Sequence, residues 1–226
     1  MKISVVIPTY NEIATGYLQR SVPRLCQSPH IELIVVDRYS SDGTLEFLQN
    51  FPLKLINSKA NTRAERLNEG LHASTGEWVL LHHPRSLLDL KAVEALLDLP
   101  AQVNWGAFTH KFDKELGLLN FTSWYSNKIR GDLRGIYYLD HCLFFQKSLF
   151  DGDPSPLPPV DIFEDTELCK KLLKVSQPVR LDFKSTTSAI RFVENGPWKQ
   201  GLLNQAMKLA YFLGLPKSAM NRIYEA

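Results

Sequence analysis

The stretch ISVVIPTYNE, residues 3–12, is followed by a second stretch of similar design, IELIVVDRYSSDG, residues 31–43. Each opens with a short apolar run rich in β-branched residues, and Pro8 stops the first run. Continuous apolar runs of this length are typical of strands buried on both faces of a parallel sheet. Each stretch then changes to polar and aromatic residues. The sequence therefore predicts two parallel strands with polar loops at their carboxyl ends.

Outward from these stretches, strands and helices alternate through the first hundred residues, which favours βαβ units and a mostly parallel sheet. Thr62 and Glu65 have the spacing of a capping box at the start of a helix. The second half is less regular, with a proline-rich loop over residues 152–161. The expected extended segments are 3–7, 32–37, 53–57, 77–82, 105–113, 137–146 and 180–190. The expected helices are 15–26, 44–50, 62–75, 118–130, 164–175 and 198–213.

The composition is that of an ordinary globular chain. The 226 residues carry a formal net charge of +2, with 44% hydrophobic and 22% charged residues. This composition excludes disordered and fibrous proteins. The net charge is too close to zero for a protein whose main partner is a nucleic-acid backbone. The three cysteines form no close pair, which suits a reducing cytosol: Cys26, Cys142 and Cys169.

The amino terminus predicts neither secretion nor membrane insertion. The apolar run after Lys2 ends at Pro8, which is shorter than a secretory core. No apolar run approaches the ~18 residues that span a bilayer. We therefore expect a cytoplasmic protein whose contact with a membrane, if there is one, is peripheral and at the inner surface.

Ligands of open parallel sheets bind outside the carboxyl ends of the strands. Three such ends deliver polar or aromatic residues, at Pro8–Glu12, Asp37–Thr44 and His82–Arg85. No G-x-G-x-x-G motif follows the first strand, and no P-loop sequence occurs in the chain. This argues against a dinucleotide-binding dehydrogenase and a P-loop kinase.

Four motifs in order resemble those of family 2 glycosyltransferases with the GT-A fold: SVVIPTYNE, IVVDRYSSDGT, RAERLNEGLHASTGEWVLL and FEDTELCKKL. The ending TSAIRFVENGPW is similar to that of a small bacterial, often cyanobacterial, subgroup. The resemblance covers nearly the whole chain. It implies an α/β GT-A domain over residues 1–226, with a nucleotide-sugar-binding half at 1–100, an acceptor half at 101–190 and an amphipathic helical tail at 191–226.

The resemblance also implies a nucleotide-sugar donor, UDP- or GDP-linked, bound by residues of the first half. Tyr10 matches the aromatic that stacks on the base, and Thr9 and Asp37 match residues that hydrogen-bond the base or ribose. The alternatives are an ordinary loop tyrosine and a carboxylate that caps the next helix. The remaining donor-side candidates are Pro8, Glu12, Arg63, Asn68, His83 and Arg85, and a plain surface role is the alternative for Arg63.

Catalytic and acceptor-side roles are likewise implied by the resemblance. Glu164 and Asp165 match the Glu-Asp motif whose Asp is the general base, and helix capping is the alternative reading. As a carboxylate at a helix start, Asp165 is expected to be stabilised in its charged form. Asp140 matches an acid of the Gly-Asp-Gln triplet, although the triplet reads Leu139-Asp140-His141 here. Arg191 and Trp198 match the tail motif, and packing on the core is the expected role of Trp198.

The metal motif departs from the family. Its Asp-x-Asp position reads His83-Pro84-Arg85, and the acidic pair after the second strand reads Asp37-Arg38. The family implies Mg²⁺ or Mn²⁺, but Arg85 replaces the direct ligand and leaves only His83 as a candidate. If the chain stays extended past the fourth strand, His83 and Arg85 point to one side. We expect Arg85 to replace the metal there, aided by Arg38; a decayed site is the alternative.

Three functions are consistent with these features. The first is an inverting glycosyltransferase that acts on an unknown acceptor, for which a lipid-linked hydroxyl is one option. The second is a non-catalytic GT-A protein that binds a nucleotide or a partner. The third is a nucleotidyltransferase, which ranks last because the chain lacks a glycine-rich first loop. The apolar stripe from Leu202 to Leu213 favours docking of the last helix to a membrane or a lipid-linked acceptor, with the polar side marked by Gln200, Asn204 and Lys208.

Overall fold

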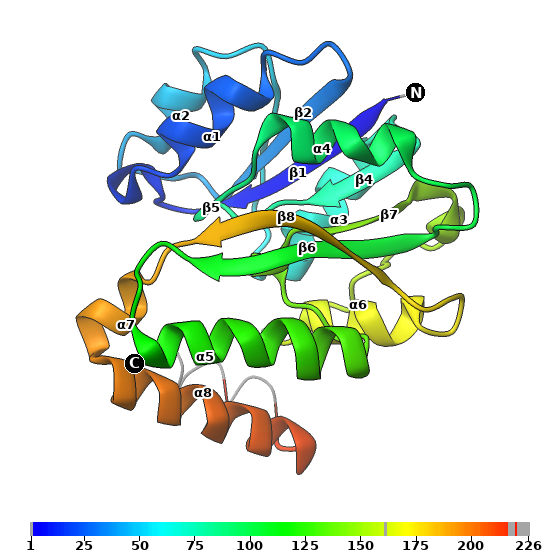
Figure 1. The fold of residues 1–226 in the computed structure, drawn as a ribbon. Helices are drawn as coiled ribbons and strands as arrows, with labels where there is room; N and C mark the ends of the chain where they lie inside the picture. Colours follow the sequence, from blue (N-terminus) through cyan, green and yellow to red (C-terminus); the bar gives the residue numbers. More distant parts are fainter. Residues whose placement is uncertain (1, 161, 217–219, 221–226) are drawn as a thin grey trace.

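The computed structural model describes residues 2–160, 162–216 and 220. In these residues a single eight-stranded sheet runs through the protein (Figure 1). The strand order is β3-β2-β1-β4-β7-β6-β8-β5. Only β5 and β7 run antiparallel to the other strands. The bounds are β1 Ile3–Thr9, β2 Ile31–Asp37, β3 Lys54–Asn57, β4 Trp78–Leu81, β5 Ser86–Leu87, β6 Trp105–Phe112, β7 Leu143–Gln146 and β8 Val179–Thr187. The predicted mostly parallel α/β sheet is confirmed.

Both faces of the central strand β1 are buried, which explains why its residues from Ile3 to Ile7 are all apolar except Ser4. Ile3, Val5 and Ile7 pack on one face, and Val6 packs in a separate cluster on the other. Side chains alternate along a strand, so each face needs its own cover. The cover of the first face includes α1 (Leu18–Leu25) and α4 (Leu90–Glu94), and that of the second includes α3 (Arg63–Ala73) and α6 (Glu164–Leu172).

The remaining helices complete the two layers and add an outer one (Figure 1). Their bounds are η1 Ile13–Thr15, α2 Thr44–Leu48, η2 Ala95–Asp98, α5 Gly117–Tyr125, η3 Ser126–Leu133, η4 Leu139–His141, η5 Lys147–Phe150, α7 Ile190–Asn195 and α8 Pro197–Phe212. Helices α5 and α8 lie side by side at the bottom of Figure 1, and the Lys208 Nζ of α8 is 5.7 Å from the Tyr125 ring centroid. Residues described by the structure include no helix that is both long and apolar enough to cross a bilayer.

Three sequence predictions need correction. The strand expected over 137–146 is only Leu143–Gln146, because the 3₁₀ turn η4 precedes it. The helix expected over 118–130 continues from α5 into the π-helical turn η3. In α8 the predicted polar side is turned inward: Gln200 is 2% exposed, whereas Leu202 is 71% exposed. The apolar stripe therefore faces outward.

The carboxyl ends of β1, β2 and β4 lie at one edge of the sheet, because these strands are parallel and adjacent. Strand β7 runs the other way, so η4, which precedes it, lies at the same edge. Helix α3 starts there too, since it follows the carboxyl end of β3. This edge collects loops from both halves of the chain.

Substituting Gly70 tests how closely α3 packs on β1. A Cβ at Gly70 would lie 2.3 Å from Val6 Cγ1, whereas one at Gly117 in α5 would meet nothing within 4 Å. We expect Gly70→Ala to lower the free energy of unfolding by about 1–3 kcal/mol through overpacking. Gly117→Ala, the matched control, should be neutral or slightly stabilising. Urea denaturation measures both; equal stability of the two variants would contradict this packing.

Candidate active site

Asp37, at the end of β2, organises the loop that follows it. Its Oδ2 accepts hydrogen bonds from Thr9 Oγ1 at 2.8 Å and Ser40 Oγ at 2.6 Å, and its Oδ1 accepts one from Ser40 N at 2.7 Å. Asp37 is fully buried. Asp37 does not cap α2, whose first N–H, that of Thr44, donates to Asp42 Oδ1 at 3.0 Å, so the capping alternative is wrong. Thr9 and Asp37 instead join β1 and β2 beneath the loops. Pro8 is part of β1 itself, paired with Val36.

Tyr10 lies just above this cluster and is open to solvent. Its side chain is 46% exposed, and the Arg38 guanidinium lies 5.0 Å from its ring centroid. Arg38 also donates from Nη2 to Asn61 Oδ1 at 2.8 Å. An exposed aromatic face beside a cation is a surface on which a nucleobase can stack next to its own phosphates.

Arg85 points back to the first loop. Its Nε donates to Glu12 Oε2 at 2.7 Å, and Glu12 is buried. Burial raises the pKa of Glu12, opposed by the bond and charge of Arg85 and by the charge of Arg191. Arg191 thus belongs to the same neighbourhood. The Glu12–Arg85 pair joins the β1 and β4 loops at the open edge.

The chain does not stay extended after β4, so the alternation argument for His83 and Arg85 is wrong. Ser86 N donates to His83 O at 3.0 Å and Arg85 N donates to His83 Nδ1 at 3.1 Å, which closes a turn. Burial and the charge of Arg63 hold the pKa of His83 well below its usual value, with Asp140 opposing them. The imidazole is therefore neutral near pH 7.

A divalent cation does not fit these side chains. Over the described ranges, no three His, Cys, Asp or Glu residues are grouped so that they could hold a metal ion. Beside His83, the guanidinium of Arg85 is paired with the carboxylate of Glu12. His83 Nδ1 already accepts from Arg85 N. The chemistry of this edge is that of cations supplied by arginine.

Glu164 and Asp165 open helix α6 and face Arg63 at the start of α3. Arg63 Nε bonds Glu164 Oε1, and Arg63 Nη2 lies 4.0 Å from Asp165 Oδ2. Both carboxylates are buried, at 1% and 6% exposed. Glu164 Oε2 has no hydrogen-bond partner among the residues that the structure describes. An orphaned carboxylate oxygen in a buried pair is costly, and such costs are concentrated at functional sites.

The environment of Asp165 corrects the expectation of a stabilised charge. Burial and the adjacent Glu164 raise its pKa to about 6, and Arg63 and the hydrogen bond from Leu139 N oppose this only in part. The helix terminus is too weak to compensate for burial beside a second carboxylate. A carboxylate with a pKa near the working pH is well matched to general base catalysis.

Asp140 lies in η4 and adds residues from the second half of the chain to this edge. Its Oδ2 lies 3.5 Å from His110 Nε2 and its Oδ1 lies 3.9 Å from His141 Nε2. Burial raises the pKa of Asp140, but the nearby His110, His141 and Arg130 outweigh this and hold it well below its usual range. Burial lowers the pKa of His141 to about 3 and also lowers that of His110. Arg130 is thus the fixed positive charge that faces this carboxylate.

Sequence reasoning missed the π-helical turn and the residues it carries. Asn127 bonds both the N and the O of His110, at 2.9 Å each, and Arg130 stacks 3.4 Å from the ring centroid of Tyr138. π-Turns inside α-helices are frequent at functional sites. Arg66 was missed as well, although it lies three residues after Arg63 on the same helix. Burial and the charges of Arg38 and Arg63 lower its pKa, which indicates mutual repulsion among these cations.

Two predicted site residues lie elsewhere. Asn68 is buried, donates to Ser155 Oγ and Leu157 O, and accepts from Leu157 N at 3.0 Å. It therefore anchors the proline-rich loop rather than facing the open edge. Trp198 is 73% exposed on α8, so the expectation that it packs on the core is wrong.

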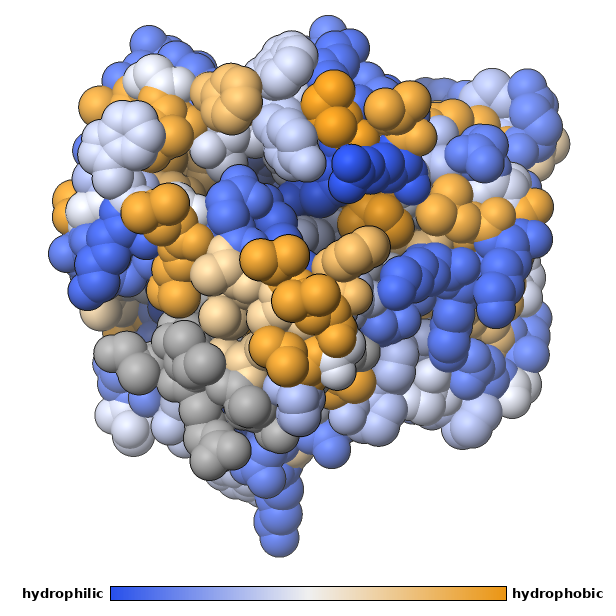
Figure 2. Space-filling model, turned by 90° about the horizontal axis from the view of Figure 1, so that it is seen from below, coloured by the Kyte–Doolittle hydropathy of each residue, from blue (hydrophilic) through white to orange (hydrophobic). Residues whose placement is uncertain are grey.

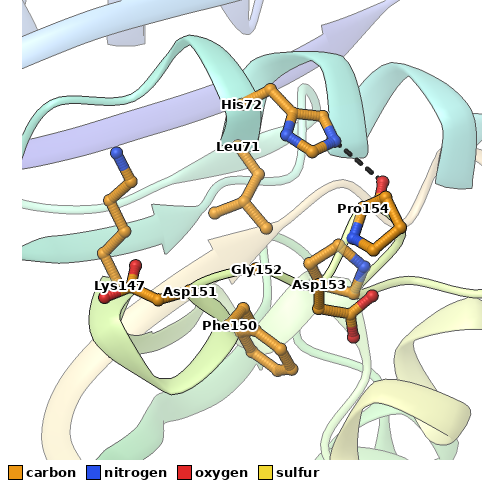
Figure 3. Close-up of a pocket in the computed structure, with 9 residues that line it drawn as sticks. Leu71, His72, Lys147, Phe150, Asp151, Gly152, Asp153 and Pro154 are labelled. Carbon is orange, nitrogen blue, oxygen red and sulfur yellow. Dashed lines mark hydrogen bonds between the residues drawn. The ribbon is translucent and has the colours of Figure 1, made fainter.

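A separate cavity of about 310 Å³ lies at the opposite edge of the sheet, beside the end of α3 (Figure 3). Its lining includes His72, Lys147 and Asp153, and His72 Nε2 lies 2.8 Å from Pro154 O. Lys147 follows the carboxyl end of β7, which runs away from the edge that collects the loops. This cavity is not part of the candidate site.

Several solved glycosyltransferases share this architecture. Residues 1–349 of S. aureus TarS, solved with UDP-GlcNAc, match with a TM-score of 0.65 and 18% identity over 83% of this chain and 58% of that one. The mannosyltransferase PcManGT from Pyrobaculum calidifontis, solved with GDP-Man and Mn²⁺, matches with a TM-score of 0.61 and 18% identity over 82% and 56%. The chain thus spans less than two thirds of the length of these structures.

Mannosyl-3-phosphoglycerate synthase from Rubrobacter xylanophilus matches over 95% of this chain and 75% of its own, with a TM-score of 0.56 and 14% identity. At such identities these likenesses establish the GT-A fold and nothing finer. The curated proteins contain no match. The family model for glycosyl transferase family 2 matches residues 4–147, which is more than half of the chain, and the chain therefore belongs to glycosyl transferase family 2.

Proposed function

We propose that this protein transfers a sugar from a nucleoside-diphosphate sugar to an acceptor hydroxyl with inversion at the anomeric carbon. The observation that carries the proposal is the buried pair Glu164–Asp165 facing Arg63, at the edge that also holds Tyr10 and Arg85. A stacking surface, cations and a carboxylate of raised pKa are the parts that such a transfer needs.

The donor in this proposal is UDP- or GDP-linked. Its base stacks on Tyr10, and its diphosphate lies against Arg38, Arg63 and Arg85. Support comes from the exposure of Tyr10, from the repulsion of Arg66 by Arg38 and Arg63, and from the UDP-GlcNAc and GDP-Man with which two structures of the same fold were solved. A diphosphate would neutralise these cations, and planar guanidinium groups suit its oxygens.

In the reaction, the acceptor oxygen forms a bond to the anomeric carbon as the bond from that carbon to the phosphate oxygen breaks. The acceptor proton passes to a carboxylate oxygen of Asp165, and the nucleoside diphosphate leaves with the bonding electrons. The arginines offset the negative charge that develops on the leaving group. Glu164 holds Arg63, which makes it a positioning residue for both partners.

The Glu12–Arg85 ion pair at the metal position favours a second candidate, a GT-A protein that binds a nucleotide without turnover. Hydrolysis of a panel of UDP-, GDP- and TDP-sugars, with water as the acceptor, separates the two. Release of free sugar from one donor supports the transferase. Nucleotide binding without release from any donor supports the non-catalytic protein.

Asp165→Asn tests the assigned base. We expect it to lower donor hydrolysis by ~10²–10⁴-fold while nucleotide binding stays unchanged, because the amide cannot take a proton. Glu167→Gln is the matched control, since Glu167 lies in the same first turn but its Oε1 bonds Tyr211. Unchanged turnover in Asp165→Asn would remove Asp165 from the mechanism.

Asp165→Asn should also stabilise the protein in a pH-dependent way. The pKa of Asp165 is raised to about 6 from 3.8. Ionisation of a group with a raised pKa costs stability, so the cost is absent below about pH 4, grows between pH 4 and 6, and is complete above pH 6. Removing it should raise the free energy of unfolding by on the order of 1–3 kcal/mol at neutral pH and little at pH 4. Denaturant titrations across this range measure it; a loss of stability at pH 7 would contradict the raised pKa.

Arg85→Ala tests the replacement of the metal by arginine. Titration calorimetry with UDP and GDP in EDTA should show binding to the unaltered protein and a 10–100-fold loss, roughly that of a charge-assisted hydrogen bond, in the variant. Arg24→Ala, an exposed arginine near the end of α1, is the matched control. Binding only after addition of Mn²⁺ or Mg²⁺, or equal binding by Arg85→Ala in EDTA, would overturn this role.

A further inference from the structure

The outward side of α8 is an apolar surface that no described part of the chain covers. Figure 2 shows apolar side chains gathered near the centre of the face seen from below, with hydrophilic ones around them. The exposed fractions are high for large apolar side chains: Trp198 73%, Leu202 71%, Leu209 59%, Phe212 85% and Leu213 65%. We call these five residues the α8 face. Exposed apolar side chains that are scattered singly are ordinary, whereas a contiguous group of them marks an interaction site.

The helix beside it contributes two more exposed aromatics. In α5, Phe121 is 59% and Trp124 is 51% exposed, and their ring centroids are 5.7 Å apart. Trp124 and Trp198 thus present indole rings to solvent from both helices. Exposed tryptophans alongside leucines and phenylalanines are the composition of surfaces that enter the interfacial layer of a bilayer.

The charges around these residues are predominantly positive. Helix α8 carries Lys199 and Lys208 and no acidic residue. The turn that continues α5 carries the exposed Lys128 and is followed by the exposed Arg134. Its single acid, Asp132, is bonded by Arg180 at 2.6 and 2.9 Å and lies 3.2 Å from Lys128 Nζ. Lysines that flank an apolar helix face complement anionic headgroups. Each lysine adds to membrane affinity if it lies within a Debye length of the membrane surface.

The inner side of α8 is bound to the candidate site. Tyr211 Oη donates to Glu167 Oε1 at 2.6 Å, in the first turn of α6 after Asp165. Its ring lies 4.7 Å from that of Phe163, the residue before Glu164, measured between centroids. A partner that binds the outer side of α8 would therefore be separated from Glu164 and Asp165 by the thickness of this helix.

We propose that the α8 face, with Phe121 and Trp124, docks onto a membrane surface that contains anionic lipid. The aromatic and leucine side chains enter the interfacial layer, and Lys199 contacts the headgroups. If the proposed function holds, docking brings an acceptor in the membrane close to Asp165, and this consequence rests on that function. The docking itself requires no nucleotide and no catalysis.

Vesicle co-sedimentation without nucleotide tests the docking. The protein should pellet with vesicles of phosphatidylcholine and phosphatidylglycerol in equal parts, and less with phosphatidylcholine alone. Leu202→Ser and Leu209→Ser, singly and together, should weaken binding by about tenfold or more. Lys199→Gln should weaken it about fivefold on anionic vesicles and hardly at all on neutral ones.

Val175→Ser is the matched control, since Val175 is 54% exposed beside Ser176, whose carbonyl accepts from Trp105 at the start of β6. It should bind like the unaltered protein. Sedimentation velocity detects the other occupant, a second copy of the chain. Failure to pellet, equal loss in Val175→Ser, or a dimer that Leu202→Ser dissociates without vesicle binding would overturn the proposal. Because no donor is present, none of these outcomes bears on glycosyl transfer.

Discussion

The contact of Arg63 with the buried carboxylates of Glu164 and Asp165 connects the two halves of the candidate site. Arg63 starts α3, between the parallel strands β3 and β4. The carboxylates start α6, and Glu164 is 101 residues further along the chain. Two adjacent buried carboxylates would repel each other and lose hydration if the cation were absent. Their burial is sustained only because α3 and α6 begin at the same edge. A cation that is shared in this way is also available to a phosphate, so the contact that holds the acids couples them to the donor.

An ion pair explains how the edge holds Arg85 among other cations. The charges of Arg38 and Arg63 already lower the pKa of the buried Arg66. The carboxylate that compensates Arg85 is Glu12, which is buried after the first strand and lies 2.7 Å from Arg85 Nε. The ion pair fixes the guanidinium between the loops that follow β1 and β4. In the proposed function, this fixed guanidinium supplies positive charge to the diphosphate.

Sequence patterns were sufficient for the first hundred residues and insufficient for the rest of the chain. The strand runs at Ile3 and Ile34 and the capping box at Thr62 depend on neighbours a few residues away, so they were predictable. The cluster around Asp140 was not, because its partner His110 lies on a strand that reaches it only through the antiparallel β7. The π-turn that carries Arg130 has no local signature in the chain. Asp37 and Asn68 show a different limit: the residue types were recognised, but which neighbour takes their hydrogen bonds is decided by tertiary packing.

The orientation of α8 follows from what it packs against, which is partly apolar and partly polar. A helix turns apolar residues toward the core when the core offers apolar partners. Here Met207, on the inner side of α8, is buried in a cluster with Phe163. The same side makes polar contacts, because Tyr211 donates to Glu167 at 2.6 Å and Gln200 accepts from Asn195 of α7 at 2.6 Å. Turning the helix over would break these two hydrogen bonds, at about 1 kcal/mol each, and would expose Met207. The exposure of Leu202 and Phe212 is thus a consequence of the apolar and polar contacts that hold α8 against the site, and the apolar surface outside is fixed in place by them.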